Sequence, residues 1–365
     1  EAPEALDIAR RRLAFEELFF FAIGLKLLRS RRETVSVEPF QPVDMAPFYN
    51  ALPFTLTDAQ RRCVDEAIAD MESGRPMNRL CQGDVGSGKT MVAAACVYFC
   101  VKNGRQAALM APTELLAEQH YRGLAPLLER LNIRCALLTG STTAKTKRSV
   151  TAQLATGEID FAIGTHALIS GSVAYADLGL VVTDEQHRFG VAQRTALAEK
   201  GEHPHTLVMS ATPIPRTLNM ALSGIRDMST IEEPPQDRIP VQTFVMEHDW
   251  NVLCDAMRRE LQRGGQVFYL HNRIENIERT ALRISKMLDG AVVDVAHGQM
   301  NEEQLSTVME RMVAGETQIL VCTTIIETGI DMPNVNTLII EDADRMGLAQ
   351  LHQLRGRVGR SNRRA

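Results

Sequence analysis

The sequence lacks a membrane-spanning run, a C-x-x-C pair and a positive net charge. The apolar stretch at residues 18–25 is far shorter than the roughly 20 residues that a membrane span needs, and charged residues flank it. We therefore expect a buried helix at this position and no membrane partner. The chain begins at Glu1 rather than at methionine, so we also expect it to be a piece of a longer protein.

Seven cysteines are scattered along the chain, an odd number without metal-ligand spacing. This pattern argues against a disulfide or metal framework and favours a reducing, cytoplasmic location. A net charge of −5 argues against a passive nucleic-acid coat. It is compatible with a motor that grips a nucleic-acid backbone in one local groove, and residues 345–365 contain six arginines and no acidic residue.

One glycine-rich stretch fits the phosphate-loop pattern G-x-x-x-x-G-K-[ST], and an apolar helical segment follows it. Backbone N–H groups of such a loop point at phosphate oxygens, and the start of the next helix adds its positive end. The lysine reaches the β- and γ-phosphates and the threonine hydroxyl holds Mg²⁺. A chance glycine-rich turn is the alternative. The predicted ATP-binding residues are Gly83, Asp84, Val85, Gly86, Ser87, Gly88, Lys89 and Thr90.

Short apolar runs alternate with amphipathic helices through two regions, which predicts an α/β fold with two tandem domains of parallel strands. Residues 1–50 are predicted to form a helical arm with a proline-rich connector. Residues 51–230 form the first expected domain, residues 229–240 a polar linker, and residues 241–365 the second domain. The expected strands are residues 107–110, 135–138, 161–164, 180–183, 207–210, 266–270, 291–296, 319–323 and 337–340.

An acidic pair, Asp184 and Glu185, directly follows one of the apolar strands. A carboxylate at a buried strand end is where a phosphate-loop ATPase holds Mg²⁺, so Asp184 is the predicted metal ligand together with Thr90. Glu185 is the predicted general base that activates water. His187 is interpreted as coupling nucleotide state to a neighbouring loop, with a simple turn cap as the alternative.

Other candidate residues lie on both sides of this core. Phe54 would stack on adenine and Gln60 would pair with its N6 and N7 edges, although core packing also explains Phe54. Ser210 and Thr212 follow a strand and suit a link between the acidic site and a mobile loop; a proline turn is the alternative.

Two arginines near the end, Arg357 and Arg360, are three residues apart on an expected helix. Such guanidinium groups neutralise charge that develops on a γ-phosphate, and a DNA-binding basic helix is the alternative. Thr324 suits a nucleic-acid phosphate, and Asp331 suits the ribose.

These residues resemble the ordered motif set of superfamily 2 helicases over residues 50–362. The matching blocks are Gln60 and residues 83–90, 111–114, 139–141, 164–166, 184–187, 210–212, 271–273, 323–331 and 353–360. The resemblance implies two tandem RecA-like domains that face each other across an ATP-binding cleft, and a coupling role for Gln353. It also implies nucleic-acid contacts at Thr113, Thr139, Gly140, Thr165, His166 and Thr324.

Within the superfamily, residues 10–18, 52–57, 83–90, 184–191 and 211–218 resemble the RecG family of branch-migrating DNA helicases. Residues 219–227, 297–300 and 323–331 are closer to the family of transcription-repair coupling factors. The resemblance implies an ATP-dependent DNA helicase or duplex translocase for branched DNA in recombination and repair, associated with the bacterial nucleoid. Single-strand-binding protein or RNA polymerase are the implied protein partners, the latter for the second family. An RNA-directed helicase and an ATP-switched scaffold that does not hydrolyse are the alternatives.

Overall fold

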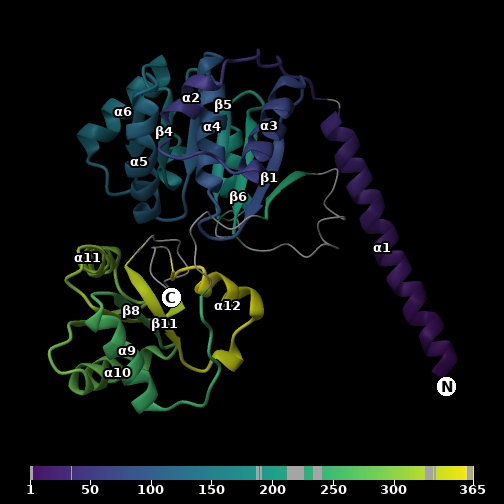
Figure 1. Ribbon diagram of the computed structural model, residues 1–365. Helices are drawn as coiled ribbons and strands as arrows, with labels where there is room; N and C mark the ends of the chain where they lie inside the picture. The colour runs from purple at the N-terminus through teal and green to yellow at the C-terminus, as the bar shows by residue number, and fades with distance from the viewer. Residues whose placement is uncertain are drawn as a thin grey trace. The chain divides into compact units, whose positions relative to one another are not determined.

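The computed structural model describes residues 3–33, 35–185, 189, 191–211, 226–232, 241–324, 332, 334–359 and 365. The chain divides into two compact units (Figure 1). The first comprises Glu1–Gly83, Lys89–Ala111 and Gly123–Ile231, and the second comprises Asp84–Gly88, Pro112–Arg122 and Glu232–Ala365. Each unit contains one parallel sheet, so the α/β prediction with two parallel sheets is confirmed.

The first sheet has seven strands in the order β3-β4-β2-β5-β6-β1-β7, and each described pairing is parallel. Its strands are β1 Asn78–Gly83, β2 Gln106–Met110, β3 Cys135–Leu138, β4 Phe161–Gly164, β5 Leu178–Asp184, β6 His205–Ser210 and β7 Asp227–Ile231. The five strands predicted for this sheet are therefore present, with β2, β5 and β6 longer than predicted.

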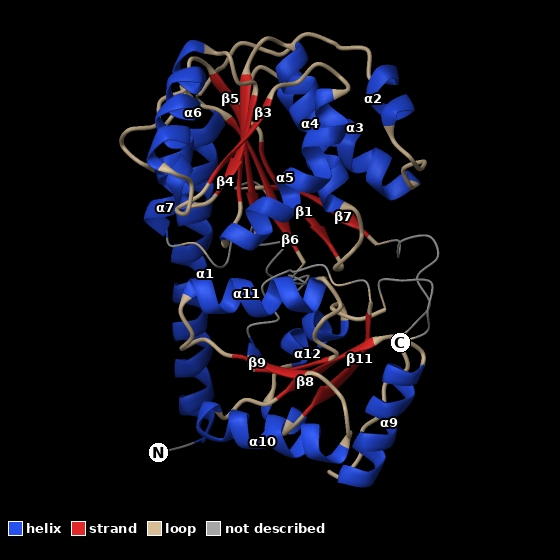
Figure 2. Cartoon of the chain, turned by 90° about the vertical axis from the view of Figure 1, so that its left-hand side faces the viewer, coloured by secondary structure: helices blue, strands red, loops and turns tan. Residues whose placement is uncertain are grey.

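Helices cover both faces of this sheet. They are α2 Ala46–Ala51, α3 Asp58–Glu72, α4 Lys89–Lys102, α5 Glu114–Glu129, α6 Ala144–Thr156 and α7 Val191–Ala198. Figure 2 shows α3 and α4 on one side of the strands and α6 and α7 on the other. Nine consecutive residues of α4, Val92–Cys100, are at most 3% exposed, because this helix is apolar on all sides.

Two strands were missed by the sequence analysis, β1 and β7. Both are about half polar, so no apolar run marks them. Ser229, Thr230 and Ile231, expected in the linker, instead pair with Cys81, Gln82 and Gly83 of β1. These residues form an edge strand because their backbone pairs with β1, which is distant in the sequence. The local sequence pattern does not reveal such a pairing.

The prediction of a buried helix at residues 18–25 was wrong about burial. These residues do lie in a helix, α1 Pro3–Glu33. However, Leu18, Phe19, Phe20, Phe21 and Ile23 are 40–70% exposed. Consecutive residues point about 100° apart around a helix, so this run does not gather on one face that could be buried. No helix among the described residues is long and apolar enough to span a membrane.

The connector between α1 and α2, residues 35–45, has no regular secondary structure, and it is fixed to the first unit. Phe40 is 5% exposed, and its ring centroid lies 4.6 Å from that of His205 and 6.1 Å from that of Phe99. The Gln41 N–H donates to Asn103 Oδ1 at 2.7 Å. These contacts join the connector to α4 and β6.

The second sheet has four strands in the order β11-β8-β10-β9, also with parallel pairings. Its strands are β8 Gln266–Leu270, β9 Val293–Ala296, β10 Ile319–Cys322 and β11 Val335–Ile340, which confirms the four strands predicted there. The helices are α9 Trp250–Gln262, α10 Ile274–Met287, α11 Glu302–Val313, α12 Leu348–Arg355 and the short 3-10 helix η4 Ala343–Arg345.

Alternating side chains of these strands form two separate cores. Phe268 and Leu320 pack with residues of α11 and α12, whereas Val267 and Ile319 pack with residues of α9 and α10. This alternation follows from the two-residue period of a strand. A parallel sheet with helices on both faces is thus built twice from the same kind of pattern.

The buried His205 makes the stability of the first unit depend on pH. Its Nδ1 accepts the Met77 N–H at 3.0 Å, and burial followed by the charge of Arg105 lowers its pKa to about 4 from 6.5. Between these values the unfolded chain binds a proton that the folded chain does not. The stabilisation is therefore complete above pH 6.5 and falls as the pH drops towards 4, by up to ~3 kcal/mol at about 1.4 kcal/mol per unit.

We expect His205→Asn, which keeps an acceptor for Met77, to flatten this pH dependence. The free energy of opening of β1 and β6, measured by hydrogen exchange from pH 7 to pH 4, is the readout. The exposed His203 provides the control variant His203→Asn. Equal pH slopes for the unmodified chain and His205→Asn would contradict the assignment.

Candidate functional site

The predicted phosphate loop lies between β1 and α4 and is a tight turn held by its own backbone. Gly86 and Gly88 have φ angles of +80° and +83°, which residues with a Cβ rarely adopt. The Asp84 carboxylate accepts the Val85 N–H at 2.8 Å, and the Ser87 N–H donates to the Asp84 carbonyl at 3.1 Å. The loop therefore has the conformation that its glycines predict.

Lys89 and Thr90 are the first two residues of α4. The Lys89 ammonium donates to the Gly83 carbonyl at 2.7 Å, so the lysine folds back over the mouth of the loop. The N-terminus of this 14-residue helix adds a positive dipole end. Because Val92–Cys100 of α4 are buried, the start of the helix has a rigid support on which an anion can bind.

The acidic pair lies at the end of β5, which pairs with β6. Asp184 is the last residue of the strand, and Glu185 follows it with φ +48°. The Glu185 N–H donates to the Met209 carbonyl of β6 at 3.1 Å, and the residue is 7% exposed. A left-handed conformation at a non-glycine residue costs on the order of 1–3 kcal/mol, and such strain clusters at functional sites.

Parallel pairing brings these groups to one edge of the sheet. β1 and β5 lie on either side of β6, with Gln82 paired to Ser210 and Asp184 paired to Met209. The carboxyl ends of β1, β5 and β6 therefore meet, and with them the phosphate loop, the acidic pair and Ser210. Ligands of open parallel sheets bind at this edge.

Thr90 and Asp184 offer oxygen donors that fit Mg²⁺. No group of three or more His, Cys, Asp or Glu side chains in the described part of the chain could hold a metal by itself. Mg²⁺ is commonly bound through one or two protein oxygens together with substrate phosphates and water, so a two-residue donor set is chemically sufficient. When bound there, it would neutralise charge on the phosphates.

The proposed adenine residues lie on and before α3. Phe54 is 51% exposed. Gln60 forms a capping box with Thr57: the Thr57 N–H donates to Gln60 Oε1 at 3.0 Å, and the Gln60 N–H donates to Thr57 Oγ1 at 3.3 Å. Gln60 thus fixes the start of α3, and its role toward adenine, like that of Phe54, stays a prediction. Four further predicted residues lie outside the described part: His187, Thr212, Asp331 and Arg360.

Polar residues also follow β3 and β4 at the same edge of the first sheet. Thr139 Oγ1 lies 3.0 Å from Ser141 Oγ and 3.2 Å from Thr142 Oγ1, and Gly140 is in the same turn. Thr165 is 2% exposed and its Oγ1 has no hydrogen-bond partner among the described residues. His166 begins the short 3-10 helix η1 His166–Ile169. The structure thus gathers these four predicted nucleic-acid residues.

The glycine between β4 and Thr165 is required by packing. A Cβ at Gly164 would lie 2.0 Å from the Leu138 carbonyl of β3. Only glycine allows β3 and β4 to approach here, and that approach sets Thr139 beside Thr165. Thr113, from another predicted block, instead caps α5 by accepting the Leu116 N–H at 3.3 Å.

Three further predicted residues lie in the part of the chain that follows the linker. Thr324 follows β10, and Gln353 is in α12. Arg357 lies in the turn after α12, where its backbone N–H donates to the Leu354 carbonyl at 2.9 Å. Their roles in coupling and catalysis stay predictions.

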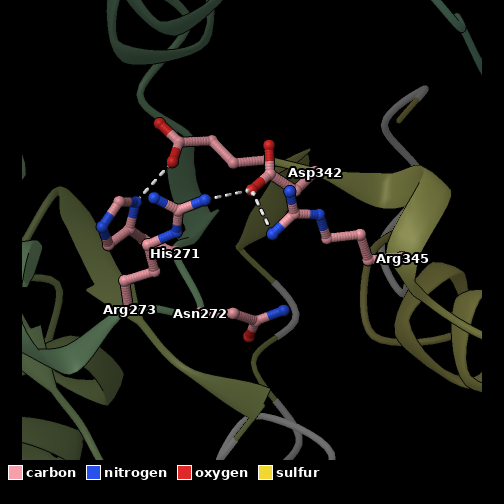
Figure 3. A pocket seen from close by; sticks show the side chains of 6 residues that line it. His271, Asn272, Arg273, Asp342 and Arg345 are labelled. Atoms are coloured by element: carbon pink, nitrogen blue, oxygen red, sulfur yellow. Dashed lines mark hydrogen bonds and ion pairs between the residues drawn. The ribbon is translucent and has the colours of Figure 1, made fainter.

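The second unit has a cavity of about 180 Å³ at the ends of β8 and β11 (Figure 3). Its six lining residues are His271, Asn272, Arg273, Glu341, Asp342 and Arg345. Arg273 Nη2 donates to Asp342 Oδ2 at 3.4 Å, and Arg345 Nη1 lies 3.9 Å from the same oxygen. Both arginine side chains are more than half exposed, so these long ion pairs contribute little to stability.

Glu341 holds this cavity together, and the sequence analysis missed it. Its carboxylate bonds the Tyr269 hydroxyl and His271 Nδ1, and His248 Nε2 lies at 3.6 Å. Burial, followed by the bond to Glu341, raises the pKa of Tyr269. The signal was the one that marked Asp184, a carboxylate directly after an apolar strand.

Comparison with known proteins identifies both halves. Residues 57–221 match the DEAD/DEAH box helicase family, and residues 249–362 match the helicase conserved C-terminal domain. The chain is 49% identical over 316 residues to the transcription-repair-coupling factor of Bacillus subtilis, covering 87% of this chain and 27% of that protein. It is 43% identical over 373 residues to the ATP-dependent DNA helicase RecG of the same organism, covering 99% and 55%.

Solved structures of helicases are also similar to this chain. A structure of RecG bound to a three-way DNA junction has a TM-score of 0.85 and 43% identity, covering 97% of this chain and 48% of that one. Dbp5 of S. cerevisiae, bound to RNA and ADP BeF3, has a TM-score of 0.65 at 17% identity and shares the fold. The chain thus spans about a quarter to about half of the curated relatives that it matches.

Replacing Lys89 tests the phosphate loop. We expect Lys89→Ala to weaken binding of a fluorescent ATP analogue by about 10- to 100-fold, since a hydrogen bond to a charged group is worth about 1.5–3 kcal/mol. Lys102 at the other end of α4, which donates to the Leu131 carbonyl at 3.1 Å, gives the control Lys102→Ala. Equal affinities for the two variants would contradict the site.

Proposed function

The chain belongs to the helicases, with a DEAD/DEAH box helicase domain followed by a helicase conserved C-terminal domain, and we propose that it couples ATP hydrolysis to movement along branched or duplex DNA. The observation that carries this proposal is the convergence of the phosphate loop with Asp184 and Glu185 at one sheet edge. The RecG and transcription-repair-coupling relatives support DNA rather than RNA as the track.

The chemistry follows from the residues at this edge. The loop N–H groups and Lys89 bind the phosphates, and Thr90 with Asp184 holds Mg²⁺. Glu185 accepts the proton of the attacking water. Arg357 and Arg360 supply guanidinium groups to the γ-phosphate from the second domain, and Gln353 and Ser210 take part in the coupling.

Backbone contacts, rather than base contacts, would hold the DNA. Hydroxyl and backbone groups at Thr113, Thr139, Gly140, Thr165, His166 and Thr324 are the proposed contacts. Hydroxyls and backbone N–H groups position a phosphate chain without reading sequence. The exposed guanidinium groups of Arg273 and Arg345 are paired only loosely to Asp342, so a DNA phosphate can replace that partner.

RecG-like action on stalled forks and Holliday junctions in recombination and repair is the first candidate role. A transcription-repair-coupling role is the second, and the 49% identity to that relative favours it. The two roles differ in partner: single-strand-binding protein in the first case and RNA polymerase in the second. Both partners and a nucleoid-associated location in the cytoplasm stay predictions.

Glu185→Gln tests hydrolysis directly. We expect it to lower DNA-stimulated ATP turnover by about 10²- to 10⁴-fold, the usual contribution of a general base, while ATP binding is retained. The exposed Glu199, changed to Gln, is the control. Unchanged turnover in Glu185→Gln would refute its role as base and favour a scaffold that only switches with ATP. Stimulation by RNA but not by branched DNA would replace the DNA track with an RNA track.

Salt dependence tests the backbone contacts. The logarithm of the DNA association constant is expected to fall linearly with the logarithm of the salt concentration. We expect little sequence preference. Arg345→Gln is expected to reduce the slope by about 1, because one phosphate contact is removed. Arg279, an exposed residue of α10, gives the control Arg279→Gln. A flat salt response of the unmodified chain would exclude backbone tracking.

A further inference from the structure

Arg79 of β1 is the buried centre of a charged cluster in the first unit that the functional site does not use. Its side chain is 11% exposed. Nε donates to Asp70 Oδ2 at 2.7 Å, and Nη1 donates to Glu66 Oε2 at 2.9 Å and to Ser229 Oγ at 2.8 Å. The Ser229 hydroxyl in turn donates to the same Glu66 oxygen. We call these four residues, Arg79, Glu66, Asp70 and Ser229, the Arg79 cluster.

The Arg79 cluster joins three elements. Glu66 and Asp70 lie four residues apart on α3, Arg79 is on β1, and Ser229 is on β7. Burial alone would lower the pKa of Arg79, but its hydrogen bond to Asp70 and the charges of Asp70 and Glu66 raise it above its ordinary value. The guanidinium is thus permanently charged, and its planar fork bridges the two carboxylates and the hydroxyl.

β7 needs such an anchor. It is the edge strand, paired only with β1 in the described sheet, and its sequence is half polar. Two more side-chain bonds attach the same region: Arg62 Nη2 of α3 donates to the Thr230 carbonyl at 3.1 Å, and Arg226 Nε donates to Asn78 Oδ1 at 2.9 Å. These side-chain bonds add to the backbone pairing of β7 with β1 and attach β7 to α3 as well.

β7 is also the last element of the first sheet. Every strand of the second sheet follows Ile231 in the sequence, so the covalent connection to the second sheet starts at β7. β1, to which the Arg79 cluster fixes it, ends at Gly83, whose carbonyl accepts the Lys89 ammonium. Four residues along one strand separate Arg79 from the phosphate loop.

We propose that Arg79 is a positioning residue that fixes the start of the interdomain connection to the phosphate-loop strand, so that a change at the nucleotide is transmitted to the second domain. This inference rests on the proposed function. It assigns Arg79, Glu66, Asp70 and Ser229 to coupling rather than to ATP binding or to chemistry. Rigid elements joined by hydrogen-bond networks carry such coupling when both ends bias the same element.

The test uses the full chain and two mild variants, Arg79→Lys and Ser229→Ala, with their double variant. Arg79→Lys keeps the charge and loses the fork, whereas Ser229→Ala removes only the link to β7. The matched control is Arg134→Lys. Arg134 makes a two-pronged pair with Asp160, at 2.9 and 2.7 Å, near the start of β3 and β4.

The first measurement is the yield of a triplex-displacement assay on duplex DNA per ATP hydrolysed. We expect this ratio to fall at least about fivefold in both cluster variants, at the low end of usual coupling effects, with KM for ATP unchanged. The double variant should lose little more than either single variant, because the two residues act through one contact. An unchanged ratio, or a ratio that falls equally in Arg134→Lys, would overturn the proposal.

The second measurement does not depend on DNA. Hydrogen exchange of β7 amides is expected to slow when a nonhydrolysable ATP analogue binds to the unmodified chain, and Arg79→Lys and Ser229→Ala should abolish that response. Exchange in β3 and β4 should stay the same. A β7 response that survives in both variants would overturn the proposal. Failure of the proposed function is separate: it would appear in the unmodified chain as ATP turnover that DNA does not change.

Discussion

Parallel pairing of β1 with β6 on one side and β7 on the other is the constraint on which the rest of this structure depends. It places the phosphate loop at the carboxyl edge of the first sheet, level with the acidic pair that ends β5. The same pairing makes β7 an extension of the phosphate-loop strand. One set of backbone hydrogen bonds therefore fixes both the nucleotide site and the start of the connection to the second sheet.

The chemistry at this edge is held by burial and strain. α4 is packed on all sides, so the lysine and threonine at its start have a rigid support. Glu185 is buried with a left-handed backbone, and its N–H donates both to the Met209 carbonyl of β6 and to Asp184 Oδ1. As the proposed general base, Glu185 would need such a fixed orientation, since misplacement by an ångström is costly in rate.

Charged groups have different tasks in the two units. In the first, Arg79 bonds two carboxylates and a hydroxyl, which favours a fixed connection between β1, α3 and β7. In the second, Arg273 and Arg345 are exposed and share one carboxylate at long range, which leaves them able to exchange partners. Burial separates the two cases: a guanidinium with short, shielded bonds is structural, and one in solvent can bind a passing phosphate.

By itself the sequence determined the phosphate loop, the acidic pair, nine of the described strands and the helicase family, because these depend on local spacing and on apolar runs. It did not reveal β1, β7, the Arg79 cluster or Glu341. The two strands are half polar, and the other residues are isolated polar positions in the sequence. Only tertiary pairing makes neighbours of Arg79 and Ser229, which lie 150 positions apart. The exposure of α1 likewise depends on tertiary packing. An apolar run favours burial, but it is buried only where another part of the fold packs against it.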